Sequence, residues 1–124
     1  MKTEFDKTLK TIRKKVYECP WSKEEEIKGH IEELLKEVKE LKEAIEKNDK
    51  INLREEIGDV FYDSMFLMFL AERDESINLE EILKTLREKI ERRTPWIFGN
   101  MKINTREEAL KVWNEIKQKE KVKI

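Results

Sequence analysis

The stretch LREEIGDVFYDSMFLMFLA, residues 53–71, decides the fold. Its centre is almost entirely apolar, and its length and composition are those of a buried helix. Three acids, Glu56, Asp59 and Asp63, nevertheless interrupt the apolar residues at helical spacing. At about 100° per residue all three fall on one flank of the apolar stripe. The stretch therefore predicts a largely buried helix that carries an acidic edge.

The rest of the chain also predicts helices. Its 124 residues include only three glycines and two prolines, and no strand-like alternation of any length. Ser22 with Glu25, and Thr105 with Glu108, have the spacing of capping boxes. Asn52 with Glu55 has the same spacing, at the start of the acidic helix. The helices are predicted over about 2–17, 23–47, 53–71, 79–93 and from 106 onward.

These helices predict an all-α fold, with one domain over residues 1–124 built from four to five helices. Because only residues 48–50 separate the second and third helices, the two should form a long antiparallel hairpin. No internal repeat or second domain is evident. The lysine-rich end, 119–124, is predicted to be a frayed tail.

Composition excludes several classes of function. The chain carries 27 Lys and Arg against 28 Asp and Glu, mostly interleaved, so no large single-sign field favours stable nucleic-acid binding. No apolar run reaches the roughly 18 residues that a membrane span needs. Cys19 is the single cysteine, so no intrachain disulfide is possible, and no secretory signal opens the chain. We therefore expect a cytoplasmic protein without a membrane partner.

A second acidic edge lies on the preceding helix, where Glu33, Glu37 and Glu40 share one flank of the apolar stripe. If the hairpin turns near residues 49 and 50, Glu40 lies level with Asp59, and Glu37 with Asp63. Converging carboxylates repel one another and have raised pKa values unless a cation neutralises them. Hard oxygen ligands select Mg²⁺, Ca²⁺ or Mn²⁺, so the two edges predict a metal site.

Simpler interpretations exist for several of these residues. Pairs with lysines such as Lys36 and Lys39 would make Glu37 and Glu40 a solvated helix face. Asp59 and Asp63 are harder to explain this way, because their neighbours are apolar. His30 lies in no Glu-x-x-His motif, which disfavours a di-iron bundle, and we expect it at a helix surface or an interface.

Four motifs, in order, resemble the MazG-type all-α nucleoside triphosphate pyrophosphohydrolases. CPWSKE (19–24) is similar to the family's Cys-Pro-Trp-Asp-Lys-Glu segment. LLKEVKE followed by LREEIGDV is similar to its Glu-Glu-x-x-Glu and Glu-x-x-Asp metal signature. EKIERRTPWIFG and VWNEIKQKEK resemble its later Arg-Arg-His-Pro-His-Val-Phe-Gly segment and its closing Trp-x-x-x-Lys helix. The resemblance covers about residues 19–121.

The resemblance implies hydrolysis of a nucleoside triphosphate to the monophosphate and pyrophosphate, with Mg²⁺ or Mn²⁺ as the cofactor. Catalysis would fall to Glu37 and Glu56, with a metal-oriented water as the nucleophile. By resemblance the metal ligands are Glu37, Glu40, Glu56 and Asp59, and the acidic edge adds Asp63. The expected nucleotide contacts are Lys89, Arg93, Trp113 and Lys117. By simpler readings, Lys89 and Arg93 complement a helix dipole, and Trp113 packs in the core.

The sequence also departs from the family pattern. Lys36 stands where the family has the first Glu of Glu-Glu-x-x-Glu. The role of that Glu is therefore unfilled in this chain, unless Glu33, one turn earlier, substitutes as a catalytic acid. The other departures are Ser22 for Asp, Ile27 for a following His, and Thr94 and Trp96 for the two later histidines. These changes put substrate choice and full activity in question, while the core metal set survives.

The resemblance further implies a homodimer or homotetramer, with Trp96, Ile97, Phe98 and Met101 as candidate interface residues. The role we expect is nucleotide-pool house-cleaning, which is the removal of unwanted nucleoside triphosphates. Two alternatives stay open from the sequence. One is a non-catalytic helical assembly or binding protein that retains the fold. The other is a narrow-substrate relative that acts on dUTP or phosphoribosyl-ATP.

Overall fold

A computed structural model describes residues 2–122, and every regular element in this range is a helix. These residues fall into two compact units, which divide between Leu79 and Glu80. The all-α prediction is confirmed, with two four-residue helices in addition to the five long ones. The helices are α1 (Glu4–Glu18), α2 (Pro20–Lys23), α3 (Ile27–Glu46), α4 (Lys50–Glu75), α5 (Leu79–Arg93), α6 (Pro95–Phe98) and α7 (Arg106–Val122).

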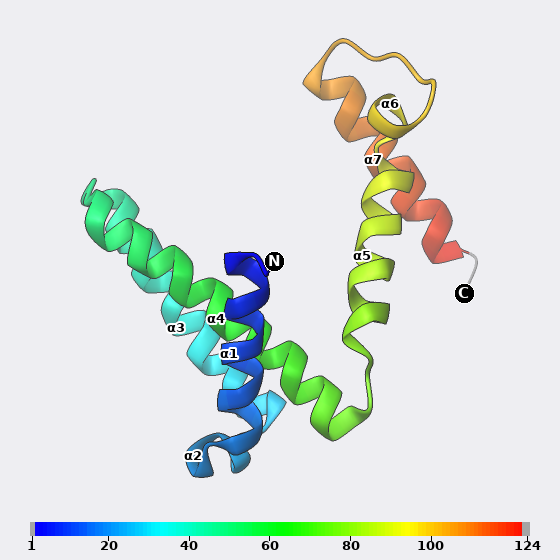
Figure 1. The fold of residues 1–124 in the computed structure, drawn as a ribbon. Coiled ribbons are helices and arrows are strands. Elements are labelled where there is room, and N and C mark those ends of the chain that lie inside the picture. The colour runs from blue at the N-terminus through cyan, green and yellow to red at the C-terminus, as the bar shows by residue number, and fades with distance from the viewer. Residues whose placement is uncertain (1, 123–124) are drawn as a thin grey trace. The chain divides into compact units, whose positions relative to one another are not determined.

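The first unit is organised around the antiparallel hairpin of α3 and α4, which lie side by side along most of their length (Figure 1). The turn between them is tight: Asn48 adopts the left-handed conformation, with φ of 53°. Asp49 then caps α4, because its side chain accepts a hydrogen bond from the backbone N–H of Asn52 at 3.1 Å. The predicted cap at Asn52 is therefore wrong, since α4 begins one turn earlier.

The core of this unit lies between α1 and α4, which pack against each other. Burying side chains of this size stabilises the fold by about 1.5–3 kcal/mol each. With α1 on one side and α3 on another, α4 is apolar over most of its circumference, which explains the dense apolar run at 60–70. The buried cluster consists of Ile12, Val16, Met65, Phe66, Phe69 and Leu70.

The segment before α3 differs from the prediction. Ser22 does not cap a helix with Glu25, because Pro20 starts the separate short helix α2, and α3 begins only at Ile27. Ser22 is fully buried, and its Oγ lies 2.6 Å from Lys15 Nζ. Arg73 of α4 donates to the carbonyl oxygens of Ser22 and Glu25 at 3.1 and 2.8 Å. These bonds fix α2 and the following residues against α4.

The second unit contains most of α5 together with α6 and α7. The predicted cap at Thr105 is confirmed, because its Oγ1 accepts a hydrogen bond from the backbone N–H of Glu108 at 3.2 Å. The predicted frayed tail, 119–124, is helical as far as Val122, where α7 ends. Residues 123 and 124 lie outside the described range. Glu120 pairs with both Arg92 and Arg93, and these hydrogen bonds lower its pKa to about 2.

None of the helices within residues 2–122 is long and apolar enough to cross a membrane.

Candidate metal centre and adjoining pocket

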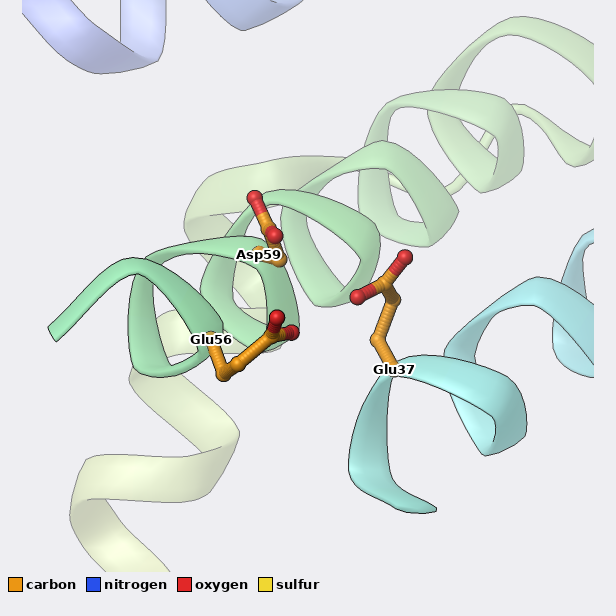
Figure 2. Close-up of side chains that lie close together, drawn as sticks. All are labelled: Glu37, Glu56 and Asp59. Atoms are coloured by element: carbon orange, nitrogen blue, oxygen red, sulfur yellow. The ribbon is translucent and has the colours of Figure 1, made fainter. Parts of the chain in front are cut away.

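Three carboxylates meet where α3 and α4 pack together. Glu37 comes from α3, and Glu56 and Asp59 lie one turn apart on α4, so all three side chains reach the same space (Figure 2). One oxygen of each lies within 4.8 Å of those of the other two. A single ion of the size of Mg²⁺ or Mn²⁺ takes several oxygen ligands at once, and this convergence supplies three.

Burial makes this cluster unusual. Glu56 is only 9% exposed, and the Oε2 atoms of both Glu37 and Glu56 are buried without a hydrogen-bond partner among the described residues. Buried carboxylate oxygens are normally hydrogen-bonded, since leaving one unsatisfied forfeits its hydration without replacement. Coordination by a divalent cation would satisfy both oxygens.

The electrostatics point the same way. Burial, followed by the nearby charges of Glu40 and Asp59, raises the pKa of Glu37 to about 7. Burial and the same two neighbours also raise the pKa of Glu56. In the absence of a cation, the cluster therefore favours retention of protons near neutral pH. A divalent ion would displace those protons and stabilise the ionised carboxylates.

The structure brings together only part of the predicted ligand set. Glu40 lies near enough to Glu37 to raise its pKa, but it is outside the converging group. Asp63 is also outside that group. The predicted register, with Glu37 level with Asp63, is wrong, because the turn is centred at Asn48 and Glu37 instead meets Glu56 and Asp59.

A pocket of about 240 Å³ adjoins the cluster and shares Glu37 and Asp59 with it. Besides acidic residues, its wall includes three aromatic side chains and one lysine. Glu33, the predicted catalytic substitute, is exposed and also lines this pocket. Its position one turn before Glu37 leaves its carboxylate accessible to water. The aromatic residues of the wall are Trp21, Tyr62 and Phe66, and the cation is Lys15.

His30 contradicts its prediction as a surface or interface residue, because it is 5% exposed within the first unit. Its Nδ1 lies 3.0 Å from Glu25 Oε2, and its Nε2 lies 3.0 Å from Asp63 Oδ1. The ring stacks on Phe66 with a centroid distance of 4.2 Å. Burial raises the pKa of Asp63, and this effect is larger than the lowering of the pKa by the nearby His30. No local sequence pattern predicts this arrangement, because His30 and Asp63 lie on different helices, far apart in the chain.

The predicted nucleotide contacts, Lys89, Arg93, Trp113 and Lys117, all belong to the second unit. There the Arg93 guanidinium lies 5.2 Å from the centroid of the Trp113 ring and pairs with Glu120 at 2.6 Å. Sequence reasoning missed Lys15, Trp21 and Tyr62. A signal existed for Trp21, which follows the proline of the CPW motif, but none existed for the other two.

A larger groove of about 800 Å³ runs along α5 and is bordered by Leu83, Leu86, Ile90 and Phe98. Its wall is mainly apolar, whereas the smaller pocket adjoins the carboxylate cluster and carries the convergent polar groups that identify a binding site. We therefore assign the candidate functional site to the cluster and the smaller pocket.

Comparison with known proteins agrees with this geometry. Residues 25–98 match the MazG nucleotide pyrophosphohydrolase domain model, and this span includes all three carboxylates of the cluster. The chain belongs to the MazG nucleotide pyrophosphohydrolase domain family.

Two named relatives are similar to this chain over most of its length. A nucleoside triphosphate pyrophosphohydrolase of Escherichia coli K12 is 30% identical over 103 residues, 83% of this chain and 39% of that protein. A nucleoside triphosphate pyrophosphohydrolase/pyrophosphatase MazG of Thermotoga maritima is 35% identical over 106 residues, 85% of this chain and 40% of that protein. The chain thus spans about two fifths of the length of these curated relatives.

A crystal structure of a mazG-related protein from Thermotoga maritima is similar in fold, with a TM-score of 0.82 and 41% sequence identity. The match covers 90% of this chain and 97% of that one.

We predict that the stability of the metal-free protein decreases as pH rises from about 4.5 to about 7. Because the pKa of Glu37 is raised, the folded state binds more protons than the unfolded state in this window, and deprotonation then disfavours folding. Glu37→Gln should flatten this dependence and raise the midpoint of thermal unfolding at neutral pH. The measurement is thermal unfolding against pH in a chelator.

Glu43→Gln, an exposed position on the same helix, is the matched control and should retain the wild-type profile. A Glu37→Gln profile as steep as that of the wild type would contradict the assignment of the slope to the cluster.

Proposed function

We propose that this chain hydrolyses nucleoside triphosphates to the nucleoside monophosphate and pyrophosphate, with Mg²⁺ or Mn²⁺ as the cofactor. The observation that carries the proposal is that Glu37 and Glu56, which converge with Asp59 beside a pocket, each have a buried oxygen with no hydrogen-bond partner within residues 2–122. The triphosphate needs divalent charge neutralisation, and the pocket offers space for the nucleoside. House-cleaning of the cytoplasmic nucleotide pool is the corresponding role.

The ligands that we propose for the cation are Glu37, Glu56 and Asp59, with Glu40 beside them. When bound, the cation would neutralise phosphate charge and lower the pKa of a coordinated water. Carboxylates are the ligand type that Mg²⁺ and Mn²⁺ prefer, and α3 and α4 hold these side chains before substrate arrives. The helices therefore supply positioning, which is the main protein contribution to phosphoryl transfer.

Proton transfer needs a group that accepts the proton of the attacking water. Glu33 and Glu37 both line the pocket, on successive turns of α3. With Lys36 at the family's usual acidic position, we propose that Glu33 takes over the role of proton acceptor. The overall reaction consumes one water and releases one pyrophosphate for each monophosphate formed.

We further propose that the chain forms a homodimer, or a tetramer of two dimers, through the exposed apolar side chains of the hairpin. Leu35 and Ile57 are 57% and 54% exposed. An apolar surface of this kind typically marks an interface, and a stable one buries about 800 Å² on each partner. The exposed apolar residues of α3 and the start of α4 are Ile31, Leu35, Val38, Ile45, Ile51 and Ile57.

Leu35→Asp should convert the dimer to a monomer, because the association would bury an unpaired charge. Sedimentation velocity measures the change. The exposed Lys28→Asp on the same helix is the control and should remain dimeric. A wild-type protein that sediments as a monomer at all concentrations would contradict the proposed interface.

For the reaction itself, we predict Mg²⁺-dependent release of pyrophosphate and monophosphate in equal amounts from at least one of the standard ribo- or deoxyribonucleoside triphosphates. Glu56→Gln should reduce kcat/KM by about 100-fold or more, because the amide removes a charged ligand from the cluster. Quantification of both products by ion-exchange chromatography tests the prediction. Glu75→Gln, exposed near the end of α4, should retain activity.

Release of orthophosphate in place of pyrophosphate would overturn the proposed reaction. Absence of any product from every triphosphate would favour the non-catalytic alternative or a specialised substrate.

A further inference from the structure

The pocket beside the carboxylate cluster contains an acid that the proposed metal site does not use. Asp63 is 6% exposed and lines the pocket, yet it lies outside the group formed by Glu37, Glu56 and Asp59. A buried carboxylate in a pocket provides a strong hydrogen-bond acceptor for a ligand. The question is which part of a ligand it would contact.

The side chain of Asp63 lies directly against the ring of His30. The imidazole Nε2 lies 3.0 Å from Asp63 Oδ1, and its Nδ1 lies 3.0 Å from Glu25 Oε2. The ring stacks flat on Phe66, with an interplanar angle of 12°. The ring is thus held between α4, α3 and the segment before α3, and Asp63 lies against it. An ionised carboxylate has two acceptor oxygens, of which Oδ1 is the one that contacts His30.

The other pocket groups suit an aromatic ring with a carbonyl oxygen. Trp21 is 68% exposed and Tyr62 is half-buried, so both present ring surface for stacking. The Lys15 ammonium lies 4.5 Å from the centroid of the Trp21 ring and 5.5 Å from that of Phe66. Within residues 2–122 it forms no ion pair with an acid, although several acids line the same pocket. Its ammonium donates one hydrogen bond to Ser22 Oγ at 2.6 Å, and because an ammonium has three donors, a further one is available for a carbonyl oxygen of a ligand.

The size and the chemistry together indicate a nucleobase. Pockets that enclose a whole small molecule typically measure about 300–1,000 Å³, so a volume of about 240 Å³ suits one part of a ligand. With Glu37 and Asp59 in the same wall, the triphosphate would lie at the cluster and the base would extend into the pocket. This placement rests on the proposed function.

We propose that Asp63 is a specificity-determining residue, which selects bases that present an exocyclic amino group and discriminates against uracil and thymine. A carboxylate accepts hydrogen bonds from amino groups such as that of cytosine, whereas it repels the carbonyl oxygen that uracil has at the same position. Lys15 would donate to the second carbonyl oxygen, which cytosine and uracil share, and so does not distinguish them. The alternative of a dUTP-specific enzyme is disfavoured on this reasoning.

CTP and UTP form the sharpest test, because their bases differ only at ring positions 3 and 4, where cytosine has an unprotonated nitrogen and an amino group and uracil has an N–H and a carbonyl oxygen. The wild-type kcat/KM for CTP should exceed that for UTP by about tenfold or more. Asp63→Asn should bring the ratio close to one or invert it, because an amide can donate to the uracil carbonyl. The effect should appear mainly in KM, while the rate with saturating substrate changes less.

Glu75→Gln is the matched control and should retain the wild-type ratio. A wild-type ratio near one would overturn the role of Asp63, even if pyrophosphate release proceeds. An unchanged ratio in a folded Asp63→Asn variant would also overturn it.

Binding of the monophosphates separates this inference from the proposed reaction. Calorimetric titration of wild-type protein with CMP and with UMP, in a chelator, needs neither catalysis nor the variant to fold. We expect CMP to bind about tenfold more tightly than UMP. If no triphosphate is hydrolysed but CMP is preferred, the proposed reaction fails and the role of Asp63 stands. Equal binding of the two, or binding of neither, contradicts the role of Asp63.

Discussion

The packing of α3 against α4 forces three acids together, and the rest of the first unit holds them there against their mutual repulsion. Tight packing of α3 against α4 places Glu37, Glu56 and Asp59 at one level, where two of their oxygens are buried without a hydrogen-bond partner in the described part of the chain. A sequence selected only for stability would replace these acids with apolar or amide side chains. We interpret their presence as the requirement of a pre-formed cation site. Such a site destabilises the protein when the metal is absent.

Other features of this unit keep the acids in position. α1 covers α4 through Ile12, Val16, Phe66 and neighbouring residues, so the helix that carries Glu56 and Asp59 is held along its length. The capped turn at Asp49 sets the level of α4 relative to α3. Arg73 anchors the segment from Ser22 to Glu25 to α4, which keeps Trp21 beside the pocket. The site is rigid because each wall is tied to the same central helix.

Much of this could be predicted from the sequence, because the periodicity of apolar and acidic residues is a local property. Residues 53–71 specify a buried helix with an acidic flank, and the short connection specifies the hairpin. The level at which Glu37 meets α4 could not be predicted, since it depends on whether Asp49 or Asn52 caps the helix. Both residues are good caps, and only the complete turn, with Asn48 in the left-handed conformation, selects Asp49.

The pocket was less predictable for a related reason. Lys15, His30 and Asp63 come from three different helices, and each has an ordinary interpretation when its own helix is considered alone. A histidine on an amphipathic helix is usually a surface residue, whereas here the aromatic ring of Phe66 and two carboxylates enclose it. Long-range contacts of this kind follow from packing and have no local sequence pattern.

Direct measurement of cation binding tests the central claim most closely. Mg²⁺ or Mn²⁺ would be titrated into the nucleotide-free protein by calorimetry near neutral pH, in buffers of different ionisation enthalpy. The account predicts saturable binding that releases protons, because the raised pKa of Glu37 leaves the cluster partly protonated, and loss of that binding in Glu56→Gln. Absence of binding, or binding that Glu56→Gln leaves unchanged, would contradict it.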